Sequence, residues 1–520
     1  MSDPAAYRLS SLDQAEVRSY IRCCYCFSHN AADVKHDKVI LALESSVSRV
    51  VEQFPILAGS VVAESEDLPT EPPNARQRDH RHDTVGARQQ HPLSLPARRE
   101  STGSNTFALL RLQDEGNDDN TKTEQHGRLK VVVLPNSQSV KPKITIFASA
   151  EFSGTYGDLA ARRMPPSILA GHFSTPLSDI PDPALGSNPV FAVQADFING
   201  GVVVAIFLHH AVADVHGLAQ VVHCMSNGIP VSKPSLQSDS IEQSRSRDRL
   251  SGSRGIKATM LNQISHGRGF SGETASVPDV DQRDGGSVHV LAFDLDKIEA
   301  TAEMMNERVA LSLEERFAKT TPLECLISIL WKSFARARRQ CLKMEKEQMS
   351  ILKHSVNMRM RLDPPLGAGY FGNACISAKA TADLVRLSLP FDVGTLGSIA
   401  GTVHNSRAAA SETQLRATIA AINDSSDVRS AFDVQVNSNT DVLITDWVEL
   451  PMADKATLDL GLGPADFVRE VSRESPTHGF LILPKKQKEG QWEVVVRFDK
   501  GTISYLLGDV GLMPFLLHVA

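Results

Sequence analysis

The sequence predicts an α/β protein built as two compact halves. Segments with the apolar spacing of helices alternate along the chain with short apolar runs that are typical of strands. At 520 residues the chain is long for a single domain, and its stretch 232–287 is poor in large apolar residues. We therefore expect an N-terminal half over 1–231, a crossover linker over 232–287 and a C-terminal half over 288–520.

The N-terminal half combines a helix, several strands and a polar insertion. Apolar residues over 38–54 recur at helical spacing, and Pro55 is expected to end that helix. The run 20–27, rich in aromatic and thiol side chains, resembles a strand. The segment at about 64–127 is dominated by Pro, Arg, Gln, Asp, Asn and Ser, so we expect an exposed or disordered insertion. Further strands are expected over 127–135, 144–152 and 190–197.

The chain is organised around one stretch that passes from a strand through a polar turn into a helix. An unbroken apolar run, 202–208, follows two glycines and predicts a strand buried on both faces. His209, His210 and Asp214 follow directly, and helical spacing begins after Gly217. Polar groups at the exit of a buried strand are held in fixed positions, so this turn is the first candidate site.

The C-terminal half begins with a strand that leads into a helix. The segment 320–339 predicts a second strong helix, with Thr321 as N-cap and Glu324 at the capping-box position. A short strand carrying Arg359 and Arg361 is expected next, and a diproline must end it. The last strands are expected over 479–483 and 492–498.

Composition excludes several classes of protein. The net charge of −7 argues against a nucleic-acid-binding surface. Cys23, Cys24 and Cys26 form a cluster without a matching second cluster, so we expect reduced thiols and no metal site. The N-terminus has no secretory pattern, and every apolar segment is too short or too interrupted to cross a membrane. A cytoplasmic location without a membrane span is expected.

The polar turn offers a general base. A neutral imidazole accepts a proton near neutral pH, and His210 has an aspartate, Asp214, four residues further on that could hold the ring or the turn. His209 is an alternative base, but the side chains of adjacent residues diverge and only one can face a substrate. No Gly-x-Ser-x-Gly elbow, phosphate loop or dinucleotide fingerprint is found. The His-x-x-x-Asp spacing alone is a weak signal.

Five blocks in a fixed order make the signal specific. Together they resemble the BAHD acyl-CoA-dependent acyltransferases, particularly the fungal branch similar to trichothecene 3-O-acetyltransferases. The blocks are PILAGSV (55–61), VFAVQADFINGGVVVAIFLHHAVAD (190–214), TTPLECLISILWKSFARAR (320–338), NMRMRLDPPLGAGYFGN (357–373) and DLGLG (459–463).

The resemblance implies a fold of two similar chloramphenicol-acetyltransferase-like halves with mixed sheets and flanking helices. A long crossover joins the halves, and a tunnel for both substrates runs between them. It implies that His210 deprotonates an acceptor hydroxyl, which attacks the thioester of acyl-CoA, most commonly acetyl-CoA, without an acyl-enzyme. Asp214 is then structural and pairs with an arginine, for which Arg359 is the first candidate and Arg361 the second. The glycine that usually follows this aspartate is Val215 here.

The DLGLG block stands where the family has Asp-Phe-Gly-Trp-Gly. The resemblance assigns Asp459, Gly461 and Gly463 a structural part in shaping the channel or the contact between the halves. Leu460 and Leu462 replace the aromatic residues, and because the motif lies away from the chemistry we expect activity to survive.

The expected function is acyl transfer to a hydroxyl of a small secondary metabolite. Acyl-CoA is then a co-substrate and no cofactor is bound; the residues that bind it are not identified, and the protein is expected to be a monomer. Two alternatives stay open. A condensation-type enzyme with a carrier-bound donor uses a related turn that the pair His209-His210 also fits. A catalytically silent, ligand-binding homologue is the other.

Overall fold

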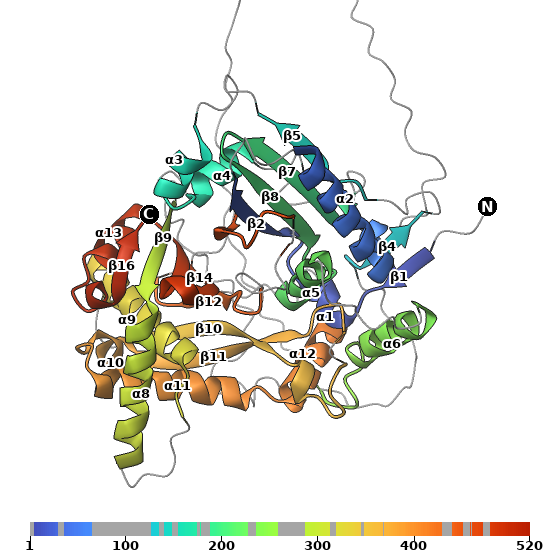
Figure 1. The fold of residues 1–520 in the computed structure, drawn as a ribbon. Helices are drawn as coiled ribbons and strands as arrows, with labels where there is room; N and C mark the ends of the chain where they lie inside the picture. Colours follow the sequence, from blue (N-terminus) through green and yellow to red (C-terminus); the bar gives the residue numbers. More distant parts are fainter. Residues whose placement is uncertain are drawn as a thin grey trace, which may run out of the picture. The chain divides into compact units, whose positions relative to one another are not determined.

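The structure is a computed structural model, shown in Figure 1, and the described residues belong to one compact unit. They are residues 5–29, 36–64, 126–134, 140–147, 154–173, 177, 188–226, 236–257, 286–311, 319–344, 348–367, 369–428, 439–450, 458, 460–471 and 479–520. The expected polar insertion lies almost entirely outside these residues.

A five-stranded sheet carries the polar turn. Its order is β13 (Phe467–Glu470), β2 (Tyr20–Ser28), β8 (Gly201–His209), β7 (Phe191–Ile198) and β5 (Lys143–Ile146). β8 is the middle strand and each of its residues is buried, which confirms the prediction of a strand buried on both faces. β7 and β8 form an antiparallel hairpin through the predicted glycine turn.

Helices cover both faces of this sheet. Alternate residues of β2 and β8 pack with α2 (His36–Gln53) and α5 (Val215–Met225) on one face. The intervening residues pack with α3 (Tyr156–Ala161) and α4 (Pro166–His172) on the other. The apolar residues of these two strands therefore divide between two separate cores, as the period of two in a strand requires.

A small antiparallel sheet closes the N-terminal region. Its order is β1 (Ala5–Arg8), β4 (Leu129–Val133), β3 (Ser60–Ala63) and β6 (Asn188–Pro189). As predicted, α2 ends before a short 3-10 turn, Pro55–Ala58, and Gly59 leads into β3. Gly59 is needed because an added Cβ would lie 2.5 Å from a side-chain carbon of Val131.

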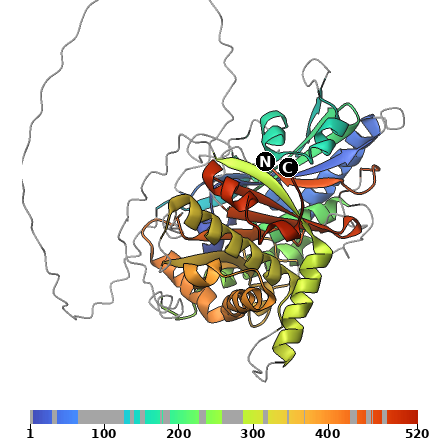
Figure 2. The same cartoon turned by 90° about the vertical axis from the view of Figure 1, so that its left-hand side faces the viewer.

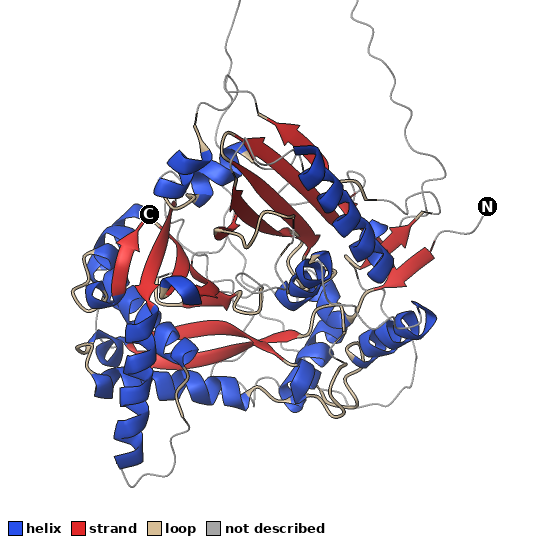
Figure 3. Ribbon diagram, in the orientation of Figure 1, coloured by secondary structure: helices blue, strands red, loops and turns tan. Residues whose placement is uncertain are grey.

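A seven-stranded mixed sheet forms the C-terminal half. Its order is β11 (Cys375–Asp383), β10 (Met349–Asn357), β12 (Val442–Asp446), β14 (Gly479–Lys486), β15 (Gln491–Phe498), β9 (Ser287–Asp294) and β16 (Leu516–Val519). β12 runs parallel to both of its neighbours, and the other pairs are antiparallel. The strands of this sheet and of the five-stranded sheet are drawn in red in Figure 3.

Helices pack against the C-terminal sheet around a second core. They are α8 (Leu295–Leu311), α9 (Pro322–Leu342), α10 (Leu384–Ser388), α11 (Val393–Ala409) and α13 (Lys500–Leu507). In Figure 2 the yellow-green helix α8 is seen extending beside this half. The predicted capping box is present at the start of α9, where Thr321 and Glu324 exchange hydrogen bonds. Two further helices, α1 (Ser11–Ala15) and α12 (Glu412–Asp424), pack together.

Some boundaries differ from those expected. Arg359 and Arg361 do not lie on a strand: β10 ends at Asn357, and both arginines belong to a 3-10 turn that follows it. The helix α5 begins at Val215 rather than after Gly217. The expected linker contains a helix, α6 (Leu236–Arg249), while 258–285 lie outside the described residues.

One strand of the N-terminal sheet comes from the C-terminal half. β13 pairs antiparallel with β2 at the sheet edge. Arg469 of β13 makes a bidentate ion pair with Glu493 of β15, with N–O distances of 2.7 and 3.0 Å, and both side chains are buried. Lys486 of β14 lies 3.4 Å from the same carboxylate. The pair therefore joins the two large sheets through one strand.

We expect Arg469→Met to lower the free energy of unfolding by about 3–5 kcal/mol, because it leaves Glu493 buried with only one of its two cations. Urea denaturation followed by circular dichroism measures the loss. The double variant Arg469→Met/Glu493→Leu should recover part of it, because the buried carboxylate is gone and Lys486 keeps the Asp466 carbonyl at 3.0 Å and the Glu489 carboxylate at 3.9 Å. A double variant as unstable as the single one would contradict this account.

Candidate active site

The two adjacent histidines have opposite environments. His209 is the last residue of β8, and its ring is fully buried edge-on against Tyr20, with ring centres 5.3 Å apart. Its Nδ1 accepts a hydrogen bond from the Ala211 backbone at 3.3 Å. Burial, assisted by the neighbouring His210 and Arg18, lowers the pKa of His209 to about 3. Such an imidazole is a poor proton acceptor near neutral pH.

His210 lies one residue further on, in the turn. Its backbone is held on both sides: its N–H donates to the Ser19 carbonyl at 2.9 Å, and its carbonyl accepts from Asn373 Nδ2 at 2.8 Å. The side chain is 27% exposed, so this ring can meet both solvent and a substrate. Its Nδ1 lies 3.6 Å from Glu16 Oε2. Of the two histidines, only His210 combines an accessible ring with a fixed backbone.

Asp214 faces away from solvent and organises the turn. It is the N-cap of α5, and its Oδ1 accepts the N–H groups of His216 and Gly217 at 3.1 Å. Its Oδ2 accepts the Ala374 N–H at 3.1 Å. A carboxylate at this position satisfies N–H groups that the first turn of a helix leaves unpaired.

Arg359 is the cationic partner of Asp214. Its Nη1 and Nη2 donate to the two carboxylate oxygens at 3.0 Å each, and Nη2 also donates to the Gly372 carbonyl at 2.7 Å. Both side chains are buried. Burial alone would raise the pKa of Asp214, but Arg359 and the backbone donors hold it at about 2. The Asp214 carboxylate is therefore ionised near neutral pH, and it stabilises the turn rather than transferring a proton.

Arg361, the second sequence candidate, does not contact Asp214. It lies at the surface and donates to the carbonyls of Arg407 and Ala410. The 3-10 turn after β10 separates the two arginines, so only the first faces the N-terminal half.

A second polar network, which the sequence did not indicate, holds the backbone carbonyl of His210. Asn373 donates through its backbone and side chain to Asp13 Oδ1, at 2.8 and 2.9 Å, while the same amide nitrogen reaches the His210 carbonyl. Arg247 of α6 lies 3.5 Å from Asp13 and donates to the Phe371 carbonyl at 2.9 Å. The sequence signal that could have pointed to Asp13 is the Ser10–Asp13 capping box. A capping box marks the start of a helix, but it does not reveal that Asp13 also contacts Asn373 and Arg247.

The DLGLG block belongs to the junction of the halves. Asp459 lies outside the described residues. Gly461 and Gly463 have φ values of +75° and +85°, a left-handed conformation that favours glycine. The side chain of Leu460 is buried in the core that β2 and β8 share with α2 and α5, which also includes Leu481 and Val495 of the C-terminal half, and Leu462 packs against this core. The block then leads into β13.

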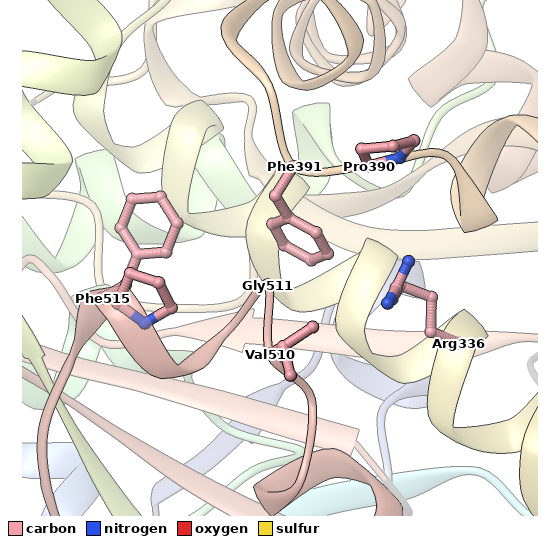
Figure 4. Close-up of a pocket in the computed structure, with 7 residues that line it drawn as sticks. Arg336, Pro390, Phe391, Val510, Gly511 and Phe515 are labelled. Atoms are coloured by element: carbon pink, nitrogen blue, oxygen red, sulfur yellow. The ribbon is translucent and has the colours of Figure 1, made fainter.

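Two cavities lie away from His210. One of about 490 Å³ is lined by Arg336, Phe391, Val510, Gly511 and Phe515, among others (Figure 4). The other, of about 140 Å³, is lined by residues of β12, β13 and β14, Trp447 and Arg497. His210 lines neither, so the tunnel between the halves stays a prediction.

Within the described part of the chain, no group of three or more His, Cys, Asp or Glu could hold a metal ion. No helix among those same residues is long and apolar enough to cross a membrane.

The fold is shared with a solved structure over almost the whole chain. The chain matches the crystal structure of Fusarium graminearum TRI101 complexed with coenzyme A and T-2 mycotoxin, with a TM-score of 0.72 and 14% identity. The match covers 98% of this chain and 99% of that one. The predicted class, two α/β halves with mixed sheets, is thereby confirmed.

The sequence comparisons identify the family. A model described as Transferase family matches residues 146–510. The acyltransferase easC of Emericella nidulans is 25% identical over 371 residues, 68% of this chain and 74% of the relative. The spermidine coumaroyl-CoA acyltransferase of Arabidopsis thaliana is 26% identical over 407 residues, which cover 76% of this chain and 80% of that relative. The chain therefore belongs to this family, the BAHD acyl-CoA-dependent acyltransferases.

We expect Arg359→Met to lower the free energy of unfolding by about 3–5 kcal/mol, because it leaves the Asp214 carboxylate buried without its cation. Arg361→Met is the matched control in the same turn, and should change stability by less than about 1 kcal/mol because its side chain is exposed. Urea denaturation of both variants measures the difference. Equal losses would show that the ion pair is not what stabilises this turn.

Proposed function

We propose that the protein transfers an acyl group from acyl-CoA directly to a hydroxyl group of a small acceptor, with His210 as general base. The observation that carries this proposal is the contrast between the two histidines. His210 is accessible and held by two backbone hydrogen bonds, whereas burial keeps His209 neutral and enclosed. A general base must be able to reach the proton that it abstracts.

The reaction conserves atoms and charge in two proton transfers. The unprotonated ring nitrogen Nε2 of His210 takes the proton of the acceptor hydroxyl as its oxygen attacks the thioester carbonyl carbon. The carbon–sulfur bond then breaks, and the CoA thiolate takes the proton back from the imidazolium. The products are an ester and free CoA, and no acyl-enzyme forms.

Asp214 and Arg359 support this chemistry without joining it. Their bidentate pair fixes the turn that carries His210, and every oxygen of the carboxylate is already engaged. We assign the DLGLG block, with Asp459, Gly461 and Gly463, to the same structural role. Its leucines pack into or against the core that β2 and β8 share with α2 and α5, and its chain continues into the shared strand β13.

We propose acetyl-CoA as donor and a hydroxylated secondary metabolite as acceptor. The support is the relationship to fungal acyltransferases and the fold shared with TRI101, whose structure contains coenzyme A and T-2 mycotoxin. We further propose two functional halves, 1–231 and 288–520, working as a cytoplasmic monomer. The seven cysteines are all free, as in reducing compartments. Elution at the monomer mass of 56.5 kDa in size-exclusion chromatography tests the oligomeric state.

We expect His210→Ala to lower acceptor-dependent release of CoA from acetyl-CoA by about 10²- to 10⁴-fold, because the general base is lost. The thiol is measured with a chromogenic reagent across a panel of hydroxylated acceptors. His223→Ala in α5 controls for effects of histidine removal, and His209→Phe keeps a ring against Tyr20. Full activity of the His210 variant, together with loss in the His209 variant, would move the base to His209.

A wild-type protein that binds CoA but releases none with any acceptor would argue for a silent homologue. Binding is measured by calorimetry with CoA on the same preparation, so that misfolding is recognised separately.

A further inference from the structure

One ring nitrogen of His210 faces a carboxylate that the proposed function does not use. His210 Nδ1 is buried and has no hydrogen-bond partner, although part of the ring is exposed. The carboxylate oxygen Oε2 of Glu16 lies 3.6 Å from it. Glu16 is 194 positions earlier in the chain, and no motif connects the two residues.

The position of Glu16 is fixed by its helix. It is the C-cap residue of α1, and its N–H donates to the Asp13 carbonyl at 3.4 Å. α1 is tied down by the Ser10–Asp13 capping box. The side chain of Gln14 adds two hydrogen bonds to the backbone of Leu129, at 2.7 and 2.8 Å. The backbone that carries Glu16 is therefore held by hydrogen bonds at several points of α1.

Three charged or titratable groups surround the Glu16 carboxylate. Burial raises its pKa, His210 opposes that rise, and Asp214 and Asp13 add to it. Each of the two aspartates has its own cation, Arg359 and Arg247 respectively. Of the three side chains that act on Glu16, only His210 can become a cation, so it is the group that can pair with this carboxylate.

We propose that Glu16 is a positioning residue that accepts the Nδ1 proton of His210 and leaves Nε2 free to act as the base. A neutral imidazole carries one donor and one acceptor nitrogen, and a partner on one nitrogen selects the tautomer. The observed separation is longer than a hydrogen bond, and such contacts in free enzymes tighten when substrate binds. The carboxylate also stabilises the imidazolium that forms during transfer. This inference rests on the proposed function.

The kinetic test removes the charge and keeps the shape. We expect Glu16→Gln to lower kcat by about 10- to 100-fold near neutral pH with little change in KM for acetyl-CoA, because part of the general-base contribution is lost. Glu16→Asp, which keeps the charge, should recover part of it. Glu44→Gln, an exposed glutamate of α2, is the matched control and should behave as wild type.

The pH profile distinguishes this role from a merely structural one. The ratio of wild-type to Glu16→Gln activity should be largest at neutral and alkaline pH and should fall as pH decreases, because Glu16 becomes protonated and its contribution disappears. A ratio that is constant with pH would overturn the proposal.

A measurement independent of turnover separates this inference from the proposed function. Nitrogen-15 shifts of His210, assigned with His210→Ala in the full chain, report which ring nitrogen carries the proton. We expect the Nδ1–H tautomer in wild type and a shift toward Nε2–H in Glu16→Ala. An identical tautomer in both proteins would overturn the role of Glu16. A changed tautomer with undiminished activity of His210→Ala would instead refute the proposed base and leave the Glu16 contact standing.

Discussion

The arrangement of the site depends on the buried ion pair between Asp214 and Arg359. It joins the turn after β8 to the turn after β10, so it spans the two halves. Each partner also makes hydrogen bonds outside the pair. The aspartate caps α5, and the arginine donates to the Gly372 carbonyl. A buried charge without its partner is costly, so both turns are stable only together. His210 takes its position from this coupling.

The halves are further interlocked by a shared strand and by a second set of hydrogen bonds. β13 leaves the C-terminal half to extend the N-terminal sheet, and it is anchored back by Arg469 and Glu493. Asn373 of the C-terminal half holds the His210 carbonyl while it is itself held by Asp13 of α1. The backbone of the proposed base is thus held by contacts from both halves, although its ring is partly exposed.

Local patterns predicted much of the fold. The apolar run of β8, the helical spacing of α2 and the capping box of α9 are each encoded within a few residues, where the periods of strand and helix dominate. The predicted ends of helices and strands were less accurate where a capping side chain or a turn sets the end. α5 begins directly after Asp214 because that side chain supplies the N-cap, and the segment with Arg359 and Arg361 forms a 3-10 turn rather than the expected strand.

The sequence by itself determined the family and the class of fold, and it singled out His210 and Asp214 as candidates, because these inferences rest on spacing within one strand–turn–helix and on ordered blocks. Two arginines were candidates for the partner of the aspartate, with Arg359 ranked first, and the tertiary structure decided for Arg359, a contact between residues 145 positions apart. It also decided that His209 is enclosed and that Glu16 faces His210. The physical reason is that burial and partner choice arise when distant segments pack, and short-range periodicity carries no information on which segments will meet.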